Sequence, residues 1–152
     1  PDSLHQEAAV LVLGAIAEGA GEAIEGHLGA VMPFLRDTLR DGTLLTKATA
    51  AWTVSRYAGW MRRNAGIGVV GEIVGILVST VAVPGNGKAS KAAFTAISVL
   101  AEQARDVLLP ALPSLANALV SHVEGDPSLA WYDCVQTVSV SMDGPFGETG
   151  VV

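Results

Sequence analysis

Cysteine, aromatic residues and charged residues are all scarce in this sequence of 152 residues. Its one cysteine, Cys134, excludes an internal disulfide, and no Asn-x-Ser/Thr glycosylation sequon occurs. Both absences are typical of a reducing compartment. The sequence begins Pro1-Asp2-Ser3 without a charged and apolar leader. We therefore expect an intracellular protein, of which this chain is a segment.

Basic residues are nearly missing from the C-terminal part of the chain. Residues 92–152 contain Arg105 as their only Lys or Arg against seven acidic residues, whereas residues 1–91 contain eight of each sign. All of the net charge of −6 therefore lies in the C-terminal part. This charge argues against nucleic-acid binding and favours a basic partner, although a solvated acidic surface is the simpler alternative.

No catalytic or metal-binding motif is present either. Three histidines, His5, His27 and His122, are scattered without metal-ligand spacing, and no histidine lies near Cys134. The segment Gly85–Ser90 superficially resembles a phosphate loop, but it lacks the first glycine and the hydroxyl residue after the lysine. We therefore expect no enzyme activity, no metal and no cofactor.

One long apolar run is a candidate for a membrane-spanning helix. Residues 65–83 are nearly all apolar and contain Gly71 and Gly75 at a spacing that occurs in membrane-helix dimers. However, Glu72 would lie near the middle of a span of marginal length. A nearly enclosed helix of a repeat explains this segment better than membrane insertion.

The sequence does contain an internal repeat. Ala-rich segments begin at Glu7, Lys47 and Lys91, at separations of 40 and 44 residues. Between them lie apolar segments interrupted by proline or glycine, at 28–39, 69–80 and 109–120. Paired helices at this period are typical of HEAT and armadillo repeats.

We therefore predict an all-α fold, an α-solenoid of about three and a half HEAT repeats. Turn residues separate the predicted helices, as at Asp41-Gly42 and Gly125-Asp126-Pro127. The repeat segment is predicted to cover residues 1–143, with a loose tail at 144–152. The predicted helices are 4–20, 27–40, 44–63, 67–82, 88–105, 107–123 and 127–142.

The helix predicted at 44–63 has two distinct stripes. Its core stripe consists of Ala51, Val54, Ala58 and Met61. About 100° around the helix lie polar residues with one large apolar member, Trp52, and Arg56 follows it by one turn. Trp52 either packs at the edge of the core or is an exposed binding anchor, and periodicity does not decide between these alternatives.

Acidic residues occur on the following helices. In the helix predicted at 88–105, Glu102 lies one step around from a core stripe of Phe94, Ile97, Ala101 and Ala104, so it could face the same groove as Trp52. Asp133 and Thr137 are one helical turn apart in the last predicted helix. A solvated surface charge is the usual alternative for such carboxylates.

Two long motifs resemble a known family. Residues 6–19, QEAAVLVLGAIAEG, and residues 52–60, WTVSRYAGW, resemble the central HEAT repeats of transportins, nuclear import receptors of the importin-β (karyopherin-β) family. A weaker resemblance continues through Ala92 to Ala104 and through Tyr132-Asp133, and thus covers nearly the whole chain.

The resemblance implies a peptide-binding site. Transportins bind an extended basic nuclear localisation signal that ends in Pro-Tyr on their concave surface. The residues that contact Pro-Tyr match Leu11, Trp52 and Arg56, with Thr49 where the family has a larger aliphatic residue. The acidic residues that meet the cargo arginine match Glu102 and Asp133, flanked by Val99 and Thr137. Val99 replaces a hydroxyl residue of the family, and Val140 replaces an acid.

The resemblance also implies partners and a location. We expect proline-tyrosine cargo to bind this segment, with Ran-GTP and nucleoporins binding other parts of a full-length receptor that shuttles between cytoplasm and nucleus. We expect no direct nucleic-acid contact and no membrane insertion. The alternative function is a HEAT-repeat scaffold that binds another protein subunit.

Overall fold

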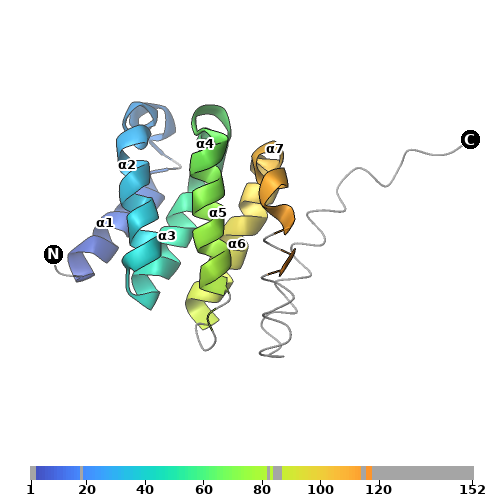
Figure 1. Cartoon of the computed structure of the whole chain (residues 1–152). Coiled ribbons are helices and arrows are strands. Elements are labelled where there is room, and N and C mark those ends of the chain that lie inside the picture. The colour runs from blue at the N-terminus through green and yellow to red at the C-terminus, as the bar shows by residue number, and fades with distance from the viewer. Residues whose placement is uncertain (1–2, 18, 82, 84–86, 114–115, 118–152) are drawn as a thin grey trace, which may run out of the picture.

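The computed structural model describes residues 3–17, 19–81, 83, 87–113 and 116–117 (Figure 1). Within these residues the chain is helical and contains no strand, which confirms the all-α solenoid prediction. The helices are α1 (Ser3–Ile16), α2 (Gly21–Asp41), α3 (Leu44–Arg56), α4 (Ala58–Asn64), α5 (Ile67–Val81), α6 (Gly87–Gln103) and α7 (Arg105–Leu108), followed by a 3₁₀ turn, η1 (Leu109–Ala111).

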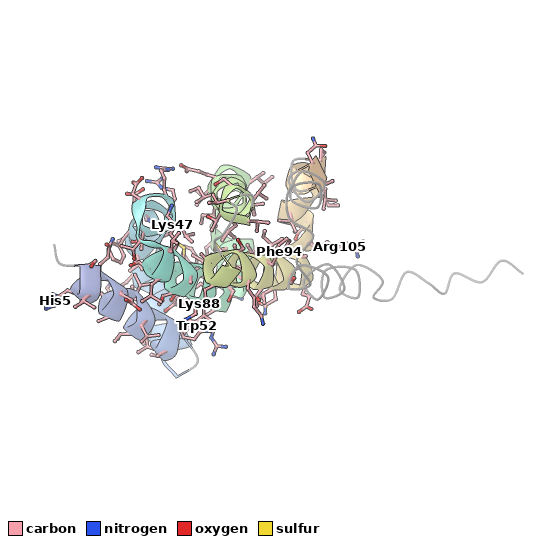
Figure 2. The ribbon with its side chains drawn as sticks, turned by 90° about the horizontal axis from the view of Figure 1, so that it is seen from below. His5, Lys47, Trp52, Lys88, Phe94 and Arg105 are labelled. Carbon is pink, nitrogen blue, oxygen red and sulfur yellow. The ribbon has the colours of Figure 1, made fainter. Side chains whose placement is uncertain are left out.

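The helices form two layers. Figure 1 shows α2, α5 and α7 side by side in front of α1, α3 and α6, and Figure 2 shows the same two layers seen from below. Neighbours within the α1–α3–α6 layer pack closely, whereas α2 and α5 touch each other at few points. Helices α2 and α5 therefore pack little against each other, and most of their packing is onto the helices of the other layer.

Small side chains allow the close approach of α3 to α6. Ala50 and Ala51 of α3 are fully buried, and so are Ala93 and Ala96 of α6. Because alanine projects little beyond the backbone, two helices lined with it can pack closely while larger residues fill the space on either side. The larger residues come mainly from α2 and α5, whose Leu28, Leu35, Leu39, Ile73 and Leu77 are almost fully buried.

The predicted core stripes lie inside the molecule. Ala51, Val54, Ala58 and Met61 are all fully buried. Of the stripe on α6, Phe94, Ile97 and Ala104 are buried and Ala101 is half-buried. The 3.6-residue period therefore identified the correct buried faces of both helices.

The helix boundaries differ from the predictions at several points. The predicted helix 44–63 is interrupted at Tyr57, which divides it into α3 and α4, and the helix predicted at 27–40 begins earlier, at Gly21. This earlier part contains Gly26, which is exposed and has nothing within 4 Å of where a Cβ would lie. The helix predicted at 107–123 begins as α7 and tightens into a 3₁₀ turn at Pro110, which has no N–H to donate.

Three sequence predictions concern residues beyond the described part of the chain. These are the helix at 127–142, the tail at 144–152 and the C-terminal limit of the repeat segment at residue 143.

Candidate functional site

The side of α3 that faces away from α2 and α5 carries one exposed stripe. Figure 2 shows Trp52 on this side and Lys47 toward the other layer. Leu45, Thr49, Trp52 and Arg56 recur at the spacing that places side chains on one helix face. Leu45 is 52% exposed and Trp52 is 37% exposed, while Thr49 and Arg56 are half-buried. The stripe is therefore an accessible row of apolar and cationic side chains.

Trp52 is held in place from two sides. Its six-membered ring lies directly against Gly14 of α1, so closely that a Cβ built on Gly14 would overlap it. The guanidinium carbon of Arg56 lies 5.8 Å from the centroid of the Trp52 ring, within the range of a cation–π contact. Trp52 therefore packs against a neighbouring helix and still leaves over a third of its surface open. Its role as a binding anchor stays a prediction.

Two hydrogen bonds fix α3 against α1 on either side of this contact. The Thr53 hydroxyl donates to the Val10 carbonyl at 2.9 Å, and the Tyr57 hydroxyl donates to the Leu13 carbonyl at 2.5 Å. Burial raises the pKa of the Tyr57 hydroxyl and so further favours the protonated form that donates this bond. The donors and acceptors are 43 and 44 residues apart in sequence. Because this separation is nearly constant, α1 and α3 run parallel, and the separation matches the repeat period.

Leu11 lies on α1 beside the exposed tryptophan. It is 51% exposed and precedes Gly14 by three residues, which places the two on neighbouring parts of the helix surface. Val10 and Gly14 are buried against α3, so Leu11 lies just outside that contact. The structure thus brings Leu11 close to the stripe that contains Trp52 and Arg56.

On α6, Val99 is half-buried and Glu102 is exposed. The C-terminal end of α6 lies beside the start of α4, because a Cβ on Gly59 would be 3.6 Å from the Oε1 atom of Gln103. Glu102 therefore lies at the end of the layer where Arg56 ends α3. The other two predicted residues, Asp133 and Thr137, lie outside the described residues.

We call the stripe on α3, together with Leu11 of α1 and the predicted residues Val99 and Glu102 of α6, the tryptophan face. Its members are Leu11, Leu45, Thr49, Trp52, Arg56, Val99 and Glu102. Leu45 was not predicted from the sequence, although its position seven residues before Trp52 indicates the same helix face. Gly14 was not predicted either, because its contact with Trp52 depends on how two separate helices pack.

The described residues bear on the metal and membrane alternatives. They contain no group of His, Cys, Asp and Glu arranged to hold a metal ion, and none of their helices is long and apolar enough to cross a membrane. Away from the tryptophan face, a groove of about 500 Å³ lies among α2, α3 and α5. It is lined mainly by aliphatic and small side chains, with Arg40, Lys47 and Glu72 among them.

Comparison with known proteins identifies relatives of this chain. Residues 4–57 match the family model of the HEAT-like repeat. Transportin of Dictyostelium discoideum is 32% identical over 137 residues, which are 88% of this chain and 15% of that protein. Human transportin-1 is 30% identical over 140 residues, 90% of this chain and 16% of its own length. Importin subunit beta-2 of Schizosaccharomyces pombe is 31% identical over 145 residues.

The matched relatives are thus several times longer than the aligned region, and the chain spans about one sixth of their length. The identity extends over 88% to 90% of this chain in these three comparisons. The chain is a HEAT-repeat segment of the transportin (importin β-2) family.

Proposed function

We propose that this chain is part of a nuclear import receptor and that its tryptophan face binds an extended basic peptide ending in Pro-Tyr. The observation that carries the proposal is the placement of Trp52, which is held against α1 yet 37% exposed beside Arg56. Tryptophan and arginine are the residue types that most often dominate protein interfaces. A fixed indole offers a flat apolar platform on which proline or tyrosine of a peptide can pack.

Each further residue of the face has a role in this proposal. Leu11 and Leu45 extend the apolar surface on either side of Trp52, and Thr49 makes this surface shallower than a larger aliphatic residue would. The Thr49 hydroxyl donates to the Leu45 carbonyl at 3.1 Å, so its proton is already used within α3. Glu102 pairs with a basic residue of the peptide, with Val99 as its apolar neighbour. Asp133 and Thr137 are proposed to continue this basic-residue site.

The functions of the full-length receptor are part of the same proposal. Relatives several times longer than the aligned region support a chain that works within a larger solenoid. We propose that Ran-GTP and nucleoporins bind repeats outside this chain and that the receptor shuttles between cytoplasm and nucleus. The segment holds cargo and performs no chemistry on it.

The test is a calorimetric titration of the chain with a basic peptide that ends in Pro-Tyr. We expect saturable binding that weakens as salt is added, because a charged peptide meets Glu102 at an exposed site. Trp52→Ala should weaken binding by roughly thirtyfold, the effect of losing a hot spot of about 2 kcal/mol. Leu44→Ala is the matched control, because Leu44 is an exposed apolar residue of α3 that lines the groove on the other side.

Circular dichroism on every variant establishes that the helices are intact. If the folded wild-type chain does not bind the peptide, or if Leu44→Ala weakens binding as much as Trp52→Ala, the proposed peptide site is wrong. A folded chain that fails to bind the peptide would favour the alternative of a HEAT-repeat scaffold for another subunit.

A further inference from the structure

Gly14 is distinguished from the other helical glycines by what lies next to it. A Cβ at Gly14 would overlap the Trp52 ring, lie 2.8 Å from its Cε3 atom and lie 2.7 Å from the Thr53 hydroxyl oxygen. By contrast, Cβ atoms at Gly26, Gly29, Gly71 and Gly75 would meet nothing within 4 Å. Gly14 lies within α1 in ordinary helical conformation. The need for glycine here is therefore spatial, because the indole occupies the place of a side chain.

The surrounding contacts prevent α1 and α3 from moving apart to admit a methyl group. Thr53 is hydrogen-bonded to Val10 four residues before Gly14, and Tyr57 is hydrogen-bonded to Leu13 immediately before it. Both bonds join a side chain of α3 or of Tyr57, the residue directly after it, to the main chain of α1, so separation of the helices would leave these polar groups unpaired. The exposed edge of the interface is occupied by Trp52, which is the one part that can swing outward.

We infer that Gly14 is a positioning residue of the peptide site: its missing side chain is what lets the Trp52 indole pack directly against α1 and under Arg56. The inference rests on the proposed function, because the position of the indole matters only if a peptide binds between Leu11 and Arg56. A methyl group at position 14 pushes the ring toward solvent and away from the pose that a peptide would meet.

The experiment compares Gly14→Ala with Gly29→Ala, the same change at an open helical position. Peptide titration should show at least a tenfold loss of affinity, or about 1.4 kcal/mol, for Gly14→Ala and no change for Gly29→Ala. The position of the ring is measured independently of the peptide in chains where Trp60 and Trp131 are replaced by phenylalanine, which leaves Trp52 as the only tryptophan. In Gly14→Ala its emission should shift to the red and be quenched more strongly by iodide.

A double-mutant cycle separates positioning from a general loss of structure. Phenylalanine is smaller than tryptophan, so Trp52→Phe should relieve the overlap of the added methyl group with the ring and leave only its close approach to the Thr53 hydroxyl. Gly14→Ala should then cost much less affinity and stability in the Trp52→Phe background than in the wild type. If Gly14→Ala alone does not fold, recovery of folding in the double variant supports the same conclusion, and failure to recover contradicts it.

The outcomes distinguish this inference from the proposed function. If the wild type binds the peptide and Gly14→Ala binds it equally well with unchanged Trp52 emission, the inference is overturned while the proposed function stands. If the wild type does not bind, the proposed function fails. The emission and quenching of Trp52 in Gly14→Ala then decide alone whether Gly14 sets the position of the ring.

Discussion

Neighbouring helices are joined differently in the two layers. Between α1 and α3, the side chains of Thr53 and Tyr57 reach main-chain carbonyl groups, and Trp52 fills the place of a side chain at Gly14. Between α2 and α5, the polar contacts are exposed ion pairs, in which Glu72 accepts from Arg36 at 3.4 Å and from Arg40 at 2.5 Å. The first interface leaves no space for a methyl group, whereas the second borders a groove of about 500 Å³.

This difference indicates that the α1–α3 interface is rigid and that the α2–α5 interface can adjust. Buried hydrogen bonds and close packing tolerate little displacement, because each group that moves loses contacts that water does not replace. Exposed ion pairs between flexible side chains can be kept when a neighbouring helix shifts, with little loss of free energy. The layer of α1, α3 and α6, which we call the tight layer, also carries the tryptophan face. The proposed binding surface is therefore built on the part of the molecule whose geometry is best fixed.

The largest expected effect follows from breaking the tight layer at Tyr57. Tyr57 is 4% exposed, so Tyr57→Ala removes a buried ring together with its hydrogen bond to Leu13. The free energy of unfolding should fall by about 3–5 kcal/mol, as for other buried aromatic side chains. Urea unfolding followed by circular dichroism measures this loss.

The matched variant Tyr57→Phe keeps the ring and removes only the hydroxyl. It should cost about 1 kcal/mol, the contribution of one hydrogen bond. Equal losses in Tyr57→Ala and Tyr57→Phe would mean that the ring contributes nothing, contrary to the packing described for this layer.

Much of this layer was predictable from sequence, and the reasons are local. The repeat period and the 3.6-residue stripes identified the paired helices and the buried faces of α3 and α6, because amphipathicity is a property of one helix at a time. The contact of Gly14 with Trp52 and the interruption at Tyr57 were not predictable in this way. The contact depends on the position of α1 relative to α3, and partners some 40 residues apart leave no local pattern. The interruption at Tyr57 has no helix-breaking residue beside it that would mark it in the sequence.

The candidate site was predicted unevenly for the same reason. Trp52 and Arg56 follow from their spacing on one helix, but whether Trp52 is open or covered depends on the helix that packs beside it. Leu11 was identified through the family resemblance, and its exposure next to Gly14 is a feature of the packed layer. Single-helix patterns therefore name the side chains of a face, while the packing between helices determines their accessibility.

A gain in stability of intermediate size is expected for a glycine substitution in the other layer, which contains α2 and α5. Gly75 lies in α5 at the groove, with nothing within 4 Å of where its Cβ would be. Gly75→Ala should raise the free energy of unfolding by up to about 1 kcal/mol, because alanine is the better helix former and meets no obstacle. Thermal unfolding checks this prediction, and a destabilised Gly75→Ala would show that the α2–α5 interface is tighter than its geometry indicates.

The smallest effect is expected for the ion pairs that link α2 to α5. Glu72→Gln removes the negative charge that Arg36 and Arg40 share, yet all three side chains remain open to water. Because exposed pairs are screened and their side chains lose entropy on pairing, the urea midpoint should change far less than in Tyr57→Phe. Any difference from the wild type should vanish in concentrated salt. A large, salt-resistant loss of stability would instead show that α5 depends on Glu72 as firmly as α3 depends on its hydrogen bonds to α1, and the contrast between the two layers would no longer hold.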